Sequence, residues 1–261
     1  MTPFSQLIAR LAPNGEDCTV DIPDDWMQGR TTYGGLTGAL CAEATRRLMP
    51  GLPRLRSAQF AFVGPAGGAV RVSPRMLRQG KSSAFVGVDV VGEQGVAARA
   101  ILTYGAARPS AFEHADAPPP PAAPLEDAPP FFREGGGGPN FSHHFETRVA
   151  GGSRPMSQGR PEILIWLRHK DRGAGAGEAA LIALADVSPP AAFAMFSAPA
   201  PLSTMTWGLD LVEEAEPDSD WFLFLSRGDA VAEGYSSQTM GLWTRSGRAV
   251  VLSRQTVAVF G

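Results

Sequence analysis

The sequence predicts an α+β fold of two tandem units, each an antiparallel sheet wrapped round a central helix. The first observation behind this is a repeated closing hairpin. Residues 92–105 and residues 245–261 each contain a Gly-centred turn, a run of small and apolar residues and an aromatic–Gly end. The second is a repeated GxSS segment upstream, which precedes the turn glycine by 15 residues in one copy (Gly80 to Gly95) and by 13 in the other (Gly234 to Gly247). Such self-similarity indicates a duplicated unit.

Length and composition agree with this organisation. The 261 residues are 44% hydrophobic and 19% charged, which is typical of a globular chain. That length accommodates two units of roughly 110–130 residues each. The net charge of -3 provides no basic field, so we expect no nucleic-acid partner.

The first unit is assigned to residues 1–108. A loop leads into a helix expected over residues 36–49, which is small or apolar on nearly all sides and therefore predicted to be buried. The Pro50-Gly51 pair ends it. Four alternating, Gly-punctuated segments then predict antiparallel strands at residues 55–64, 69–80, 83–92 and 96–105.

Residues 109–140 are dense in Pro and Gly and are interpreted as a surface linker, with a Pro-rich docking motif as the alternative. The second unit, residues 141–261, repeats the order of the first. Two strands precede a helical stretch from Glu178 to about Phe196, which Pro189-Pro190 must break or end. The strands are expected at residues 145–152, 162–170, 202–212, 219–234, 236–246 and 249–260.

Several function classes lack their signals. There is no apolar run long enough to span a bilayer and no signal-peptide pattern, so we expect a cytoplasmic protein. Two cysteines argue against a disulfide framework, and Cys41 is expected in the core. The four histidines are scattered, with His143 and His144 expected on the surface, so neither a metal nor a cofactor is predicted. Nucleotide-loop, GxSxG and GxGxxG patterns do not occur in a fitting context.

Asp186 is the candidate for chemistry, because it lies in the most apolar helical stretch of the chain. Burial of a carboxylate is costly and raises its pKa. Thr204 and Gln255 are polar residues within apolar strands of the same unit, whereas the first unit has not assembled such a set. This asymmetry indicates one active site in a duplicated scaffold. The alternative is that Asp186 caps the following turn or faces water.

At these residues the chain resembles the type II acyl-CoA thioesterases, which have a fused double-hotdog fold with one continuous sheet. The resemblance covers most of the chain apart from the linker. It rests on residues 29–30, 33–35, 53–57, 60–65, 78–82, 166–168, 184–186, 189–190 and 254–255. The chain departs from the family after Thr204, where residues 205–209 are MTWGL, and after Gln255, where Thr256-Val257 follow. The departures leave the acyl-chain preference open.

The resemblance implies hydrolysis of acyl-CoA by a water that Asp186, Thr204 and Gln255 hold. Ser203 replaces Thr204 if the alignment with the family is off by one residue, which on a strand changes the face that the side chain occupies. Gly34 and Gly35 are expected to let the thioester approach the first helix. An apolar slot formed by Phe193, Met195 and Phe196 is one expectation, and plain core is the other. Candidates for the CoA phosphates are Arg30, Arg56, Arg78, Lys81 and Arg168.

Two other interpretations remain open. One is a non-catalytic acyl-thioester-binding protein. The other is a hydratase, which is disfavoured because no His follows Asp186 within residues 187–191. The resemblance also implies further assembly through the exposed sheet face, as a homodimer or homotetramer.

Overall fold

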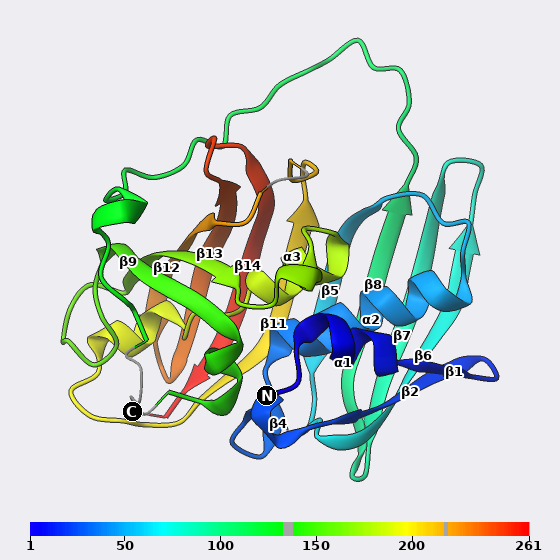
Figure 1. Ribbon diagram of the computed structural model, residues 1–261, viewed down its shortest axis with the longest axis horizontal. Helices are drawn as coiled ribbons and strands as arrows, with labels where there is room; N and C mark the ends of the chain where they lie inside the picture. The colour runs from blue at the N-terminus through cyan, green and yellow to red at the C-terminus, as the bar shows by residue number, and fades with distance from the viewer. Residues whose placement is uncertain (133–137, 217–218, 261) are drawn as a thin grey trace.

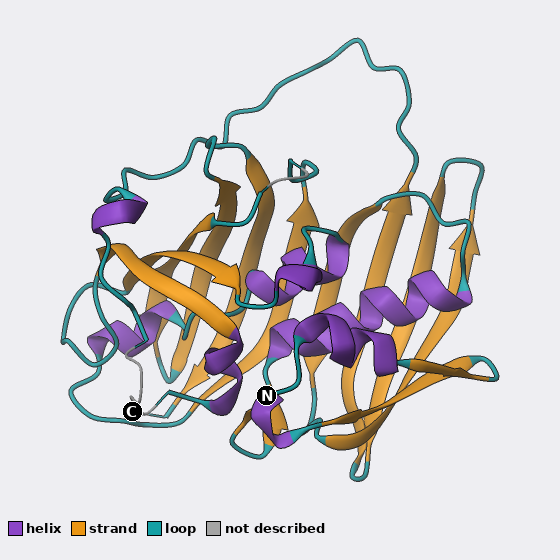
Figure 2. Ribbon diagram, viewed as in Figure 1, coloured by secondary structure: helices purple, strands orange, loops and turns teal. Residues whose placement is uncertain are grey.

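The computed structural model describes residues 1–132, 138–216 and 219–260, and its main feature is one antiparallel sheet with helices against one face (Figures 1 and 2). In the described residues this sheet has 12 strands in the order β1-β2-β6-β7-β8-β5-β11-β14-β13-β12-β10-β9. The strands are β1 (Ala12–Asn14), β2 (Asp17–Ile22), β5 (Leu55–Phe62), β6 (Gly68–Gln79), β7 (Ser83–Gly92), β8 (Gly95–Gly105), β9 (Phe145–Gly152), β10 (Glu162–His169), β11 (Leu202–Leu211), β12 (Phe222–Ala232), β13 (Tyr235–Thr244) and β14 (Ala249–Val259). The helices are α1 (Phe4–Arg10), α2 (Gly34–Leu48) and α3 (Glu178–Leu184), and β3 (Met27–Gln28) pairs with β4 (Thr31–Thr32).

The two halves of the chain share this sheet through one strand pair. Strand β5 of the first half is antiparallel to β11 of the second, with Phe60 opposite Trp207 and Ala58 opposite Leu209. The predicted α+β fold with one continuous sheet is therefore confirmed, and the strands expected from alternation form at the expected places.

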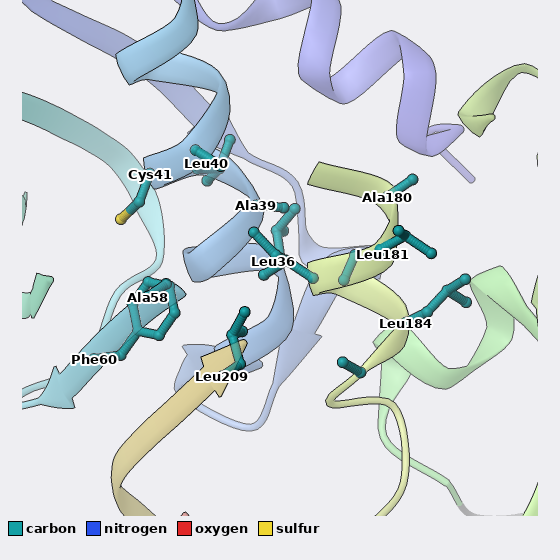
Figure 3. Packing of buried hydrophobic residues seen from close by; sticks show 14 of the residues in the cluster. Leu36, Ala39, Leu40, Cys41, Ala58, Phe60, Ala180, Leu181, Leu184 and Leu209 are labelled. Atoms are coloured by element: carbon teal, nitrogen blue, oxygen red, sulfur yellow. The ribbon is translucent and has the colours of Figure 1, made fainter. Parts of the chain in front are cut away.

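Helices α2 and α3 lie side by side in opposite directions on the inner face of the sheet. Gly35, at the start of α2, donates a hydrogen bond to Asp186 beyond the end of α3, and Arg46 near the end of α2 pairs with Glu178 at the start of α3. Figure 3 shows the helix side chains above the sheet residues that bury them. The labelled residues are Leu36, Ala39, Leu40, Cys41, Ala58, Phe60, Ala180, Leu181, Leu184 and Leu209.

Small residues on α2 make this close packing possible. A Cβ atom on Gly38 would lie 2.8 Å from Ile182 Cγ2, closer than side chains normally approach. Cys41 is fully buried, as expected. The predicted burial of α2 is confirmed, because the helix packs against both α3 and the sheet.

The second helix is shorter than predicted. Helix α3 ends at Leu184, and a separate 3-10 turn spans Ala191–Met195. The break expected at Pro189-Pro190 is present, because these residues lack the N–H groups that would continue a helix, but α3 already ends at Leu184, before the prolines. Asp186 consequently follows the helix, where its carboxylate is free to turn toward α2.

The proline-rich linker packs against the protein instead of only spanning it. Trp243 donates its indole N–H to Ala117 O (2.8 Å), and Trp166 donates to Ala123 O (2.9 Å). These tryptophans belong to a small apolar cluster on the sheet face opposite to α2 and α3. The linker therefore covers part of the outer face of the second half. Residues 133–137 lie outside the described part of the chain.

An aromatic cluster covers the entry to α2. The His144 ring stacks on Trp26 with 3.8 Å between centroids, and Tyr33 stacks on Phe141 at 4.2 Å. His144 is 5% exposed, so its predicted surface position was wrong, whereas its neighbour His143 is exposed. Burial lowers the pKa of His144.

None of the described helices combines the length and apolar character needed to cross a membrane.

Candidate active site

Asp186 sits at the seam between the halves, directly after α3. Its Oδ2 accepts the backbone N–H of Gly35 (2.8 Å), and its Oδ1 accepts the side-chain N–H of Gln255 (2.6 Å). The side chain is partly buried. Desolvation raises the pKa of Asp186 to about 6, against the opposing effect of the two hydrogen bonds. A carboxylate with this pKa is mostly ionised at neutral pH, yet is basic enough to accept a proton.

Gly34 and Gly35 are needed for this approach of the carboxylate to α2. A Cβ atom on Gly34 would lie 2.8 Å from both Asp186 Oδ2 and Phe62 Cζ. One on Gly35 would lie 2.5 Å from Tyr33 Cε2 and 2.8 Å from the carbonyl oxygen of Ala183. The Gly35 N–H is bound to Asp186, while Gly34 lines the adjoining cavity. The glycine pair therefore accommodates the carboxylate as well as opening the helix N-terminus to the cavity.

Gln255 reaches Asp186 from β14, across from Gln238 on β13. Its Oε1 accepts an N–H of Gln238 (2.9 Å), and both amides are buried. Sequence reasoning missed Gln238. The signal that would have found it is the hairpin register, because Gln238 and Gln255 are directly opposite each other in the pair of β13 and β14.

Thr204 faces the same side of the sheet as Gln255 because of a bulge in β11. Thr204 is opposite Val257 and Trp207 is opposite Gln255, and the register shifts between Thr204 and Thr206. Without the extra residue, Thr204 and Trp207 would point to opposite faces. Thr204 lines the cavity beside Asp186, but the two described hydrogen bonds to the Asp186 carboxylate come from Gly35 and Gln255. Ser203 also lines the cavity.

The cavity at Asp186 has a volume of about 1080 Å³ and is built by both halves of the chain. Of the three residues expected to form an apolar slot, Phe193 lines the cavity, whereas Met195 and Phe196 are outside the described lining. Phe196 packs edge-on against Phe193, with 5.3 Å between the ring centroids. Sequence reasoning missed the aromatic residues that strand β5 and the C-terminal end of the linker region contribute to the lining. These are Phe62, Phe131, Phe132 and Phe141.

Comparison with protein families identifies the family of the chain. An acyl-CoA thioesterase N-terminal domain model matches residues 22–105, and an acyl-CoA thioesterase C-terminal domain model matches residues 115–259. The chain belongs to the acyl-CoA thioesterase family. The N-terminal match covers strands β5 to β8, and the C-terminal match covers strands β9 to β14 and includes Asp186, Thr204 and Gln255.

Solved structures similar to this thioesterase family member share its fold along nearly the whole chain. A hotdog-fold protein of unknown function from Alicyclobacillus acidocaldarius aligns with a TM-score of 0.87 at 20% identity, covering 100% of this chain and 99% of the other. The TesB protein of Mycobacterium avium subspecies paratuberculosis aligns at 0.79 and 16%, covering 98% of each chain. The acyl-CoA thioesterase II TesB2 of Mycobacterium marinum aligns at 0.75 and 15%, also covering 98% of each. No curated protein matches the chain in sequence.

Of the five basic candidates, the structure brings Arg30 to the cavity of this thioesterase family member. Arg56 donates to Gly105 O, and Arg168 pairs with Glu146 and Asp220. Arg78, near the end of β6, and Lys81, in the turn between β6 and β7, are both exposed. Arg154, which sequence reasoning missed, also lines the cavity.

The opposite end of the helix pair is built differently. There the Glu178 carboxylate pairs with Arg46 and accepts the backbone N–H of Leu55 (2.8 Å). The end of the helix pair away from Asp186 therefore holds an ion pair, whereas the end at Asp186 holds a carboxylate bonded to a backbone N–H and an amide.

Proposed function

We propose that this chain hydrolyses acyl-CoA thioesters to the free acid and CoA, using a water activated at Asp186. The observation that carries the proposal is the Asp186 carboxylate, held between the Gly35 N–H and the Gln255 amide and open to a large cavity. Each carboxylate oxygen accepts one bond from the protein and keeps lone pairs for water. Its pKa of about 6 suits a general base at neutral pH.

In the proposed reaction Asp186 takes a proton from water while the water oxygen attacks the thioester carbonyl carbon. Thr204 and the second N–H of the Gln255 amide hold this water. The oxyanion of the tetrahedral intermediate lies at the N-terminus of α2, where Gly34 permits close approach and the helix dipole favours negative charge. The intermediate then collapses, the carbon–sulfur bond breaks, and the protonated Asp186 returns its proton to the leaving CoA thiolate.

The two ends of the substrate have matching surroundings in the cavity. The acyl group lies against the aromatic residues, with Phe193 on the side of the second half and Phe62 on the side of the first. The CoA phosphates meet Arg30 at the cavity edge. We place this activity in the cytoplasm and expect homodimers or homotetramers.

The test is Asp186→Asn, measured as release of free thiol over a panel of short to long acyl-CoAs. Proton transfer by a positioned base contributes about 10²–10⁴-fold, so kcat should fall by about 10² or more while the fold is kept. Asp210→Asn is the matched control, because Asp210 is an exposed residue of the adjacent strand β11. Parent-like turnover by Asp186→Asn removes Asp186 from the mechanism. Binding without thiol release by the parent would instead indicate a non-catalytic acyl-thioester binder.

A further inference from the structure

We propose that Gln238 is a positioning residue that determines which end of the Gln255 amide faces Asp186. This role rests on the proposed function, because it concerns the hydrogen bond that holds the proposed general base. Gln238 lies on β13, is outside the described cavity lining, and bonds to Gln255 and not to Asp186, so it acts through Gln255.

The hydrogen bonds form a directed chain of four groups. The backbone N–H of Ala191 donates to Gln238 Oε1 (2.9 Å). Gln238 Nε2 donates to Gln255 Oε1 (2.9 Å) and to Met240 Sδ (3.3 Å). Gln255 Nε2 donates to Asp186 Oδ1 (2.6 Å). Both hydrogens and the oxygen of the Gln238 amide therefore have partners.

The direction of this chain follows from its first member, because a backbone N–H can only donate. A reversed Gln238 amide would place its NH2 group against the Ala191 N–H and its oxygen against the oxygen of Gln255. A reversed Gln255 amide would place an oxygen against the Asp186 carboxylate. Since Gln238 is 1% exposed and lies outside the described cavity lining, water has little room to compensate for its reversal.

The Ala191 N–H is held in place by the chain around it. Pro190 precedes it with a ring-fixed φ of -52°, and Ala191 begins the 3-10 turn Ala191–Met195. Ala191 is itself fully buried. The prolines after Asp186 thus end the helical stretch and also present the donor that orders both glutamines.

In any pH–rate profile, the contribution of other charged or titratable groups near Asp186 must be separated from the effect of Gln238. Burial and the Asp186 charge raise the pKa of Tyr33 well above its usual value, so Tyr33 stays neutral. Arg30 and Arg154, which carry guanidinium groups, line the same cavity. His143 also lines it, so each profile is repeated in a His143→Gln background.

Two substitutions at Gln238 separate a positioning role from a packing role. Gln238→Met keeps the length of the side chain but removes the amide, so Gln255 loses its directing partner. We expect kcat to fall about tenfold or more, as for loss of a buried hydrogen-bond partner. The acid limb of the pH–rate profile should move to higher pH, because the carboxylate of Asp186 loses a reliable donor.

Gln238→Glu gives a more specific signature. When protonated, the new carboxyl reproduces the amide: one oxygen accepts from Ala191 and the O–H donates to Gln255. When ionised, it can only accept, so it reverses Gln255. The variant should therefore lose activity as pH rises, with an alkaline limb that the parent lacks. Circular dichroism across the same pH range checks that the fold persists.

Ser236→Ala is the matched control, since Ser236 is fully buried on the same strand and its Oγ has no hydrogen-bond partner among the described residues. Gln238→Met should add nothing in a Gln255→Met background, because the role passes through Gln255. Should the variants not fold, the side-chain ¹⁵N signals of both glutamines in the parent serve instead, and both should follow the titration of Asp186.

Three results would each overturn this role for Gln238. The first is that both Gln238 variants keep the pH–rate profile of the parent. The second is that the effects of Gln238→Met and Gln255→Met on kcat are additive. The third is that the Gln238 amide signal does not change as Asp186 titrates. These failures are distinct from failure of the proposed function, in which Asp186→Asn would itself turn over like the parent.

Discussion

The Gly35 N–H donates to the carboxylate of Asp186 across 2.8 Å, and this bond joins the two halves of the chain at the site. Gly35 belongs to the helix α2 of the first half, and Asp186 follows the helix α3 of the second half. Gln255 completes the site from the last strand. Neither half alone contains the set, so the duplication provides one composite site at the seam.

The glycine pair should separate catalysis from stability. In Gly34→Ala the new Cβ meets the ends of two side chains, Asp186 and Phe62, which can shift. We therefore expect a folded protein. Its kcat should be reduced at least tenfold, because the carboxylate is displaced. In Gly35→Ala the new Cβ meets the backbone carbonyl of Ala183, which cannot move cheaply. That variant should lose about 1–3 kcal/mol of unfolding free energy.

Thermal or urea unfolding and thiol release on the same preparations check both expectations. Gly51→Ala is the control, because a Cβ there has no described atom within 4 Å. Parent-like activity and stability in both site variants would contradict the close approach of Asp186 to α2.

The pH–rate profile should report the ionisation of Asp186. Burial raises its pKa from 3.8 to about 6. The proposed general base must be ionised, so kcat/KM should be level above that value and fall tenfold per pH unit below it. Gln255→Met should move this limb to higher pH, since a hydrogen bond to the charged form lowers the pKa. A parent profile that stays level down to pH ~4, near the ordinary value for Asp, would contradict the raised pKa.

Much of this architecture follows from local sequence pattern. Alternation predicts the strands, and the apolar residues around Asp186 mark it as a costly carboxylate. The extent of the second helix was overestimated because apolar composition continues past Leu184, where the helix ends, as far as the break at Pro189-Pro190. The linker was interpreted as a tether because its docking depends on Trp166 and Trp243, which are distant in sequence.

The unpredicted parts of the site depend on register and on contacts between the halves. The bulge in β11 turns Thr204 inward, and no alternation pattern encodes an extra residue. Gln238 becomes significant only once it is paired with Gln255. The Gly35 bond to Asp186 spans 151 positions, so local propensity carries no information about it.

Arg30 should affect binding of CoA without affecting the chemical step. It is exposed and lines the cavity, so Arg30→Ala should raise KM for acyl-CoA severalfold and leave kcat unchanged, as expected for an exposed charge worth about 0.2–1 kcal/mol. The effect should shrink at high salt, because ions screen the attraction to the phosphates. An acyl-pantetheine thioester lacks the nucleotide phosphates, so its KM should not change. Arg78→Ala is the control, since Arg78 is exposed but outside the described cavity lining. An equal rise in KM for both substrates would show that Arg30 shapes the cavity instead of binding phosphate.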